Sequence, residues 1–104
     1  MRELQHPAVA DIDLGEVLFA LADPVRRRLV ARLDEGGECG TTQCAGEGMA
    51  ASTASHHFKV LREAGVTCTR RLVSLRRQDL DDRFPGLLDA VLREERAAVR
   101  PLSW

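Results

Sequence analysis

Apolar positions recur with the spacing of an α-helix along most of the chain, and the pattern is clearest in residues 51–64. There, Ala54, Phe58 and Leu61 stand at i, i+4 and i+7, which places them on one side of a helix. Gly65 comes next, and a glycine directly after the last turn commonly ends a helix. The pattern therefore predicts a helix over residues 51–64 that packs this apolar stripe inward.

The opposite face of this predicted helix carries hydroxyl groups, an imidazole and an ammonium group, and only Glu63 at its far end is acidic. The residues of this face are Ser52, Thr53, Ser55, His56 and Lys59. Solvated faces usually mix charges of both signs, whereas short donors without nearby acids suit base edges and phosphates. Taken alone, the face fits a nucleic-acid surface and an ordinary polar surface equally well.

Two more helices are predicted before this one. Acidic residues from Asp11 onward favour a helix N-terminus, and the apolar residues after them predict a helix over residues 11–22. Asp23-Pro24 combines an N-cap acceptor with a proline at the first helical position, so a second helix should run from there to about residue 34. The apolar positions of the two helices are Leu14, Val17, Leu18, Leu21, Leu29, Val30 and Leu33.

Three consecutive arginines occupy the first turns of the second helix, where the helix dipole disfavours positive charge. Arg26 falls on the same side as the inward Leu33, so we expect it to form an ion pair with an acid of the first helix. Arg27 and Arg28 point away from the core, where they could reach phosphate or simply be solvated.

Residues 38–48 have the weakest pattern in the chain. Thr41 or Thr42 can cap a short helix here, although the glycines that follow reduce its helix propensity. A turn at Gly48 should then lead into the helix over residues 51–64, with Met49 packed in the core.

A hairpin is expected after Gly65. Residues 66–69 are rich in β-branched side chains, and residues 72–75 predict a second strand. Nothing from Val66 to Arg77 is Gly, Asn, Asp or Pro, although a two-residue hairpin loop normally needs one of them. We therefore expect several residues of the hairpin tip to be absent from the printed sequence.

Two helices are predicted after the hairpin. Residues 78–84 are acidic and predict one turn of helix, and Pro85 is expected to begin a last helix that ends at Pro101. The apolar face of that last helix comprises Leu87, Leu88, Val91, Leu92 and Val99.

Charge is unevenly distributed, although the net charge is only −1. Residues 1–48 carry −4, residues 49–77 carry +5 and residues 78–104 carry −2. The positive charge lies in the segment that holds the predicted hairpin and the helix before it, as binding to phosphates requires.

The 104 residues fit one domain. The chain contains no signal-peptide pattern and no apolar run of ~20 residues, so we expect a cytoplasmic protein.

Two motifs in this order and at this separation resemble the ArsR/SmtB family of bacterial winged helix-turn-helix repressors. They are Leu-Ala-Asp-Pro-Val-Arg-Arg-Arg-Leu-Val at residues 21–30 and Ser-Thr-Ala-Ser-His-His-Phe-Lys-Val-Leu-Arg-Glu-Ala-Gly-Val at residues 52–66. The resemblance covers roughly residues 12–77 and implies a winged helix-turn-helix, mainly α with a small β-hairpin, in a single domain over residues 1–104. The chain departs from the family at Ala50, where a serine cap is usual.

The resemblance implies a DNA-binding transcriptional regulator that acts as a repressor, binding a palindromic operator as a homodimer. The expected DNA-binding residues are Ser52, Thr53, Ser55, His56 and Lys59 in the recognition helix and Arg70 and Arg71 at the base of the wing. The helices over residues 11–22 and 85–100 are expected to pair across a two-fold axis, with interface residues Leu14, Leu18, Leu88, Val91 and Leu92. A protein-interaction module that keeps the winged-helix shape without binding DNA is the alternative, and the positive middle segment counts against it.

The three cysteines could form a metal site, because the resembled family includes sensors of arsenite and transition metals. Cys39, Cys44 and Cys68 do not have the family's Cys-x-Cys spacing or the spacing of a zinc site. They could still form a trigonal soft-metal or arsenite site if the fold brings them together. The alternative, which we favour, is three unconnected thiols that pack as small hydrophobic groups, with no bound cofactor.

No pattern of catalytic residues is present in the sequence. It contains neither a phosphate-cradling glycine loop nor a nucleophile elbow. Ser55 and His56 are neighbours on a helix and cannot face each other as nucleophile and base. We therefore expect that the protein is not an enzyme.

Overall fold

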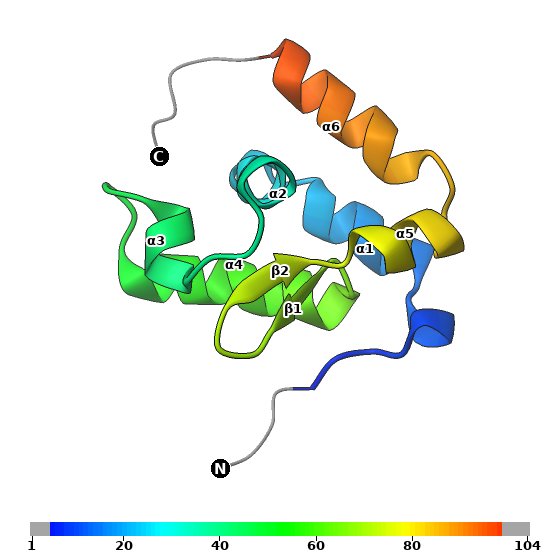
Figure 1. The fold of residues 1–104 in the computed structure, drawn as a ribbon, viewed down its shortest axis with the longest axis horizontal. Coiled ribbons are helices and arrows are strands. Elements are labelled where there is room, and N and C mark those ends of the chain that lie inside the picture. The colour runs from blue at the N-terminus through cyan, green and yellow to red at the C-terminus, as the bar shows by residue number, and fades with distance from the viewer. Residues whose placement is uncertain (1–4, 99–104) are drawn as a thin grey trace.

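The computed structural model describes residues 5–98. Within this range, helices make up most of the fold and one antiparallel hairpin follows the fourth α-helix (Figure 1). In chain order the elements are η1 Val9–Asp11, α1 Leu14–Leu21, α2 Pro24–Gly36, α3 Thr41–Ala45, α4 Ala51–Ala64, β1 Thr67–Thr69, β2 Val73–Leu75, α5 Arg77–Arg83 and α6 Leu87–Ala97. This confirms the predicted winged helix-turn-helix, mainly α with a small β-hairpin.

Two aspartates set the starts of α1 and α2. The Asp13 carboxylate accepts a hydrogen bond from the backbone N–H of Glu16 at 3.1 Å, so α1 begins at Leu14 rather than at the predicted Asp11. The Asp23 carboxylate accepts from the N–H groups of Val25 at 2.8 Å and Arg26 at 3.2 Å, which confirms the predicted cap of α2. Both side chains satisfy N–H groups that a helix leaves without partners at its first turn.

The α4 helix has the predicted bounds and supplies the centre of the core. Ala54, Phe58 and Leu61 are buried, as the apolar stripe predicts, and Gly65 ends the helix in the left-handed conformation with φ 86°. A side chain at Gly65 would also collide with Ile12, because a Cβ there would lie 2.7 Å from the Ile12 Cγ1 atom. The segment before α1 therefore covers the C-terminal end of α4 only because this position is glycine.

The strands β1 and β2 pair in antiparallel register, with Thr67 opposite Leu75 and Thr69 opposite Val73. Cys39 adds a short third segment, because its N–H donates to the Val73 carbonyl at 3.0 Å and its carbonyl accepts from the Val73 N–H at 2.8 Å. Three residues, 70–72, join the strands without any glycine. The expectation of missing tip residues was wrong, because a three-residue loop closes the hairpin.

The last helix, α6, packs against α2, whereas α5 packs against α6 and η1. The α6 helix begins at Leu87 rather than at the predicted Pro85, because Gly86 before it adopts a positive φ of 85°. Ion pairs of Arg27 with Glu95 (3.2 Å) and of Arg96 with Asp34 join α6 to α2. The predicted positions Val99 and Pro101, and the end of the predicted helix over residues 85–100, lie outside the described residues.

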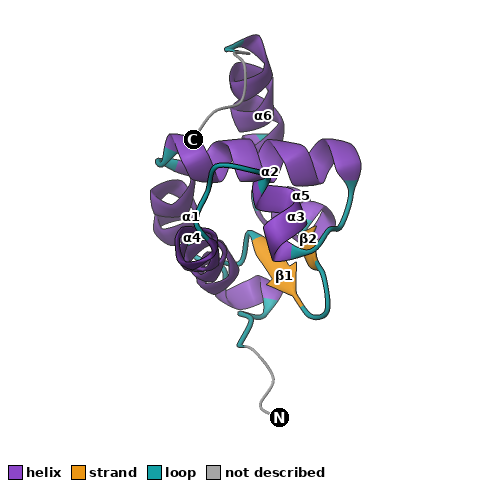
Figure 2. Cartoon of the chain, turned by 90° about the vertical axis from the view of Figure 1, so that its left-hand side faces the viewer, coloured by secondary structure: helices purple, strands orange, loops and turns teal. Residues whose placement is uncertain are grey.

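The arrangement separates two sides of the molecule. Figures 1 and 2 both show α6 on one side of α2, and α4 and the hairpin on the other. None of the helices among residues 5–98 is long and apolar enough to cross a membrane.

Candidate nucleic-acid interface

The outward face of α4 has the composition that the sequence predicts and is open to solvent. The side chains of Ser52, Thr53, Ser55, His56 and Lys59 are all exposed. The helix begins after Ala50, whose side chain makes no capping hydrogen bond. The first N–H groups of α4 are therefore not satisfied by that side chain, and they carry the positive end of the helix dipole. This end of the helix attracts anionic groups.

The helix before α4 is short and is tied to α2. The guanidinium of Arg32 donates to the carbonyl of Cys44 at 2.7 Å and to that of Ala45 at 2.9 Å, which satisfies the C-terminal carbonyls of α3. Gly40 caps the start of α3, and no threonine side chain does so, which corrects the predicted cap. Met49, expected in the core, is only half-buried. A turn thus joins α3 to α4, and Arg32 of α2 holds the end of α3 from which this turn begins.

The two arginines of the wing lie at its tip, not at the base where we expected them. Arg70 and Arg71 are exposed in the three-residue loop between β1 and β2. Between Glu63 and Asp79 the sequence contains no acid. The wing is therefore positively charged and lies on the same side of α2 as α4.

Arg26 is buried and holds the end of α1 against α2 and α4. Its Nε donates to the carbonyl of Ala20 at 2.6 Å, and its Nη2 donates to the carbonyl of Phe19 at 3.5 Å. The expected ion pair with an acid of the first helix was wrong. The C-terminal carbonyls of α1 carry the negative end of a dipole and take the place of that acid. The one carboxylate near Arg26 in the described structure is the cap Asp23, 4.0 Å away.

His57 of α4 completes this contact. Arg26 Nη1 lies 3.3 Å from His57 Nδ1, and because a guanidinium only donates, Nδ1 must be the acceptor. Burial lowers the pKa of His57; the charge of Asp23 opposes this effect, whereas the charges of Arg26 and His56 add to it. Burial raises the pKa of Asp23, but hydrogen bonds from the Arg26 and Val25 N–H groups, with the Arg26 charge, hold it below its ordinary value. The α4 helix is thus linked to α1 through Arg26.

The comparisons with known proteins agree with this geometry. A family model described as a helix-turn-helix domain matches residues 21–70, from the end of α1 to the wing. An uncharacterized HTH-type transcriptional regulator of Bacillus subtilis (strain 168), YceK, is 36% identical over 87 residues, and the match covers 74% of this chain and 84% of that protein.

The chain belongs to the helix-turn-helix transcriptional regulators. The part of this helix-turn-helix regulator that the family model matches contains α2, α3, α4 and β1. Membership places the protein among regulators of transcription.

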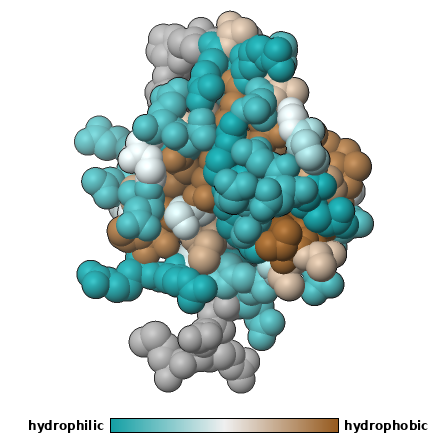
Figure 3. Space-filling model, turned by 45° about the vertical axis from the view of Figure 1, so that its right-hand side comes forward, coloured by the Kyte–Doolittle hydropathy of each residue, from teal (hydrophilic) through white to brown (hydrophobic). Residues whose placement is uncertain are grey.

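The helix-turn-helix regulator exposes an apolar surface on α1. Leu14 and Leu18 are 44% and 47% exposed, and Phe19, which the sequence reasoning missed, is 67% exposed. Phe19 could have been found as an apolar residue beside the outward Leu18. Figure 3 shows apolar side chains reaching the surface in patches between polar ones. An exposed surface with three large apolar side chains is typical of a site that contacts another protein.

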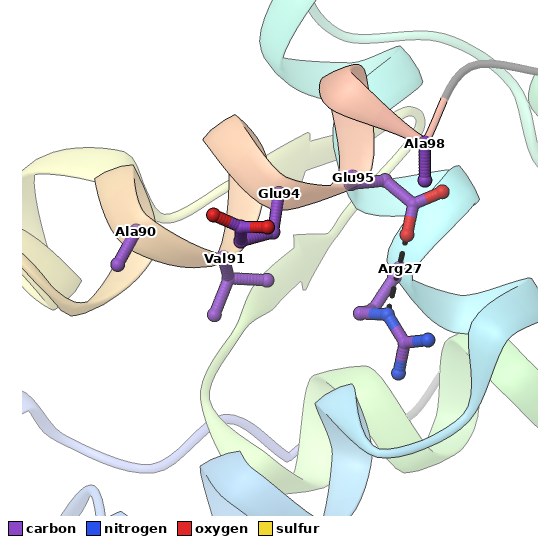
Figure 4. Close-up of a pocket in the computed structure, with 6 residues that line it drawn as sticks. All are labelled: Arg27, Ala90, Val91, Glu94, Glu95 and Ala98. Carbon is purple, nitrogen blue, oxygen red and sulfur yellow. Dashed lines mark hydrogen bonds and ion pairs between the residues drawn. The ribbon is translucent and has the colours of Figure 1, made fainter.

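The predicted interface residues of α6 are not all available to a partner. Leu88 and Leu92 are 2% and 1% exposed, so they pack inside the protomer, whereas Val91 is half-buried. This corrects the assignment of Leu88 and Leu92 as interface residues, because α6 uses them to pack on the core. Val91 lines a shallow groove with Arg27, Ala90, Glu94, Glu95 and Ala98 (Figure 4).

Arg27 is also structural, which differs from both of its predicted uses, contact with phosphate or simple solvation. It donates to the carbonyls of Leu21 at 2.8 Å and Ala22 at 2.9 Å and pairs with Glu95. These contacts give α1 a second cation at its C-terminal end and explain why α2 tolerates arginines in its first turns. Arg28 also has an interaction within the described structure.

The cysteines are free thiols in different settings. Cys44 is buried, whereas Cys39 and Cys68 are half-buried. Burial raises the pKa of the Cys44 thiol to about 12, helped by its hydrogen bond with Cys39. A thiol with that pKa stays protonated near neutral pH, and soft metals bind the thiolate. Among residues 5–98, no three His, Cys, Asp or Glu side chains are grouped to hold a metal ion.

Proposed function

We propose that the protein is a homodimeric repressor that binds a palindromic operator, placing α4 in the major groove and the wing against the adjacent backbone or minor groove. The observation that carries this proposal is the exposed, acid-free start of the outward face of α4, on the same side of α2 as the wing arginines. Short donors such as Ser52, Thr53, Ser55 and His56 suit base edges, whereas Lys59, Arg70 and Arg71 suit phosphates.

The proposed dimer uses the apolar surface of α1. Leu14, Leu18 and Phe19 would pack across a two-fold axis, together with Val91 of α6. The dimer would resemble those of the ArsR/SmtB family. A two-fold axis would place two copies of α4 one turn of DNA apart, about 34–36 Å, which matches the half-sites of a palindrome. Repression would follow where the bound dimer covers a promoter.

A salt titration of DNA binding tests the proposal. The protein is mixed with random-sequence duplex at low salt, and the affinity is followed by gel shift as salt is raised. We expect salt-sensitive binding, and Lys59→Ala should lower the slope of log affinity against log salt by about one unit for all sequences alike. Gln43→Ala, which changes an exposed residue of α3 without changing charge, is the matched control and should keep the slope.

The same titration distinguishes the alternative function. A protein-interaction module on this scaffold would leave random duplex unbound at every salt concentration. Binding in which Lys59→Ala has the wild-type slope would instead retain a DNA-binding protein but remove this face of α4 from the interface.

We propose further that the protein holds no soft metal or metalloid and acts in the cytoplasm. The protonated Cys44 thiol supports the first part. Arsenite, added to the protein under reducing conditions, should leave operator affinity unchanged. A loss of binding that disappears in the Cys44→Ser variant would show a thiol site and overturn this part of the proposal.

A further inference from the structure

The loop at the tip of the wing contains an exposed leucine next to two arginines. Leu72 is 41% exposed. The other exposed large apolar side chains of the described structure, Leu14, Leu18 and Phe19, all belong to the surface of α1. Leu72 lies in the loop of the hairpin and not on α1, so the proposed dimer contact through α1 does not include it.

The pairing of the hairpin places Leu72 beside Arg70. Thr69 lies opposite Val73, and the Arg70 N–H donates to the Leu72 carbonyl at 3.1 Å, so the next two residues also face each other and Arg71 forms the apex. Directly opposed residues share one face of a hairpin, and neighbouring pairs alternate between faces. Because Val73 is buried, the pair of Arg70 and Leu72 faces away from the core.

The base of the wing is held on both edges. Val73 exchanges two backbone hydrogen bonds with Cys39, at 2.8 and 3.0 Å, and the Thr69 N–H donates to the Nε2 of His6 at 3.0 Å. A loop of three residues on such a base has little freedom. The backbone at its tip therefore loses little conformational entropy when the loop contacts a partner.

We propose that Leu72 is a wedge that enters the minor groove of the operator and partly unstacks one base step, while Arg70 and Arg71 contact the flanking phosphates. The proposal rests on the proposed DNA-binding function. Proteins that bind the minor groove commonly insert a leucine or similar side chain between bases and bend the duplex. Pyrimidine–purine steps unstack most easily, so the wedge would select such a step without a hydrogen bond to any base.

DNA bending by wild-type protein and by the Leu72→Ala variant tests the wedge. Each protein selects duplexes from a pool with a randomised central segment, and energy transfer between dyes at the two ends of the selected duplexes measures the bend. We expect the wild-type protein to bend DNA and to enrich a TA or CA step beneath the wing. Leu72→Ala should lose both effects, bind about tenfold more weakly and keep the wild-type salt slope, because no charge changes.

Two further variants separate the wedge from the charge of the loop. Leu72→Met retains a long apolar side chain and should restore the bend. Arg71→Ala should lower the salt slope by about one unit. Circular dichroism and thermal unfolding should show that all three variants keep the fold, because the changed side chains are exposed.

The outcomes distinguish this inference from the function on which it rests. If wild-type protein and Leu72→Ala bend DNA equally and select the same steps, the wedge is wrong and the DNA-binding function stands. If Leu72→Met fails to bend DNA, as Leu72→Ala is expected to do, an apolar side chain at this position is not what bends the duplex, and the wedge is wrong. If wild-type protein binds no duplex at low salt, the proposed function and the wedge are both overturned.

Discussion

The helices α1 and α4 pack against each other, bury one face each in the same core and expose faces of opposite chemistry. The α1 helix turns Leu14, Leu18 and Phe19 toward solvent, whereas α4 turns serines, a threonine, a histidine and a lysine outward. The buried faces are alike and explain the fold. The exposed faces differ, and the difference supports the proposed dimer contact through α1 and the proposed DNA contact through α4.

The largest expected effect is a loss of stability when a side chain is removed from the buried face of α4. Phe58→Ala should lower the free energy of unfolding by about 3–5 kcal/mol, because it removes a fully buried ring and leaves a cavity. Urea or thermal unfolding measures the change. Lys59→Ala, the neighbouring outward position, should stay within about 0.5 kcal/mol of wild type. Similar losses for the two variants would contradict the division of α4 into an inner and an outer face.

A smaller effect, which concerns only the outer face of α1, is expected from Leu18→Asp. A charge placed in a dimer interface made by this helix should shift the protein toward monomer in analytical ultracentrifugation. Loss of the second half-site contact should then weaken binding to a palindrome by about 100-fold or more. Gln43→Asp adds the same charge on α3 and should remain dimeric. If Leu18→Asp sediments as wild type does, α1 is not the interface.

Features that depend on neighbouring residues were predicted from the sequence, and features that depend on distant packing were not. The bounds of α4 follow from its apolar stripe and from Gly65, and the start of α2 follows from Asp23; both signals act within a few residues. The true partners of Arg26 are carbonyls at the end of α1, whose position only the folded chain determines.

The candidate site divides in the same way. The outward residues of α4 follow from helical periodicity, so their exposure was predictable. The position of Arg70 and Arg71 at the wing tip depends on a hairpin loop that closes without glycine, which the turn rules did not anticipate. Leu88 and Leu92 could not be assigned to core or interface from a stripe of apolar residues, because both uses produce the same pattern.

A finer test addresses the outer face of α4 alone. If Ser55 and His56 contact base edges, changing either to alanine should alter which base pair is preferred at one position, by about 1–3 kcal/mol. Selection of duplexes from a random pool by each variant measures the preference. The overall fold and the salt slope should not change with Ser55→Ala. Identical selected sequences for wild type and both variants would show that these side chains do not read bases.

The smallest expected effect is a change of stability with pH at the contact between α1 and α4. There, His57 of α4 accepts a hydrogen bond from Arg26, and Arg26 also binds the end of α1. The pKa of His57 is lowered in the folded protein, chiefly by burial, so the unfolded chain binds a proton first as the pH falls. Stability should therefore decrease from about pH 7.5 to about pH 5.5, across the ordinary histidine pKa of about 6.5.

The His57→Gln variant should lose less stability than wild type over that pH range, in urea unfolding at each pH, because it removes the titrating group at this contact. His56→Gln changes the exposed neighbour and should retain the wild-type decrease, since His57 is still present. Protonation of His57 would also remove the acceptor of Arg26 and place two positive charges 3.3 Å apart. Equal pH dependence in wild type and His57→Gln would show that this contact does not make the packing of α1 on α4 sensitive to pH.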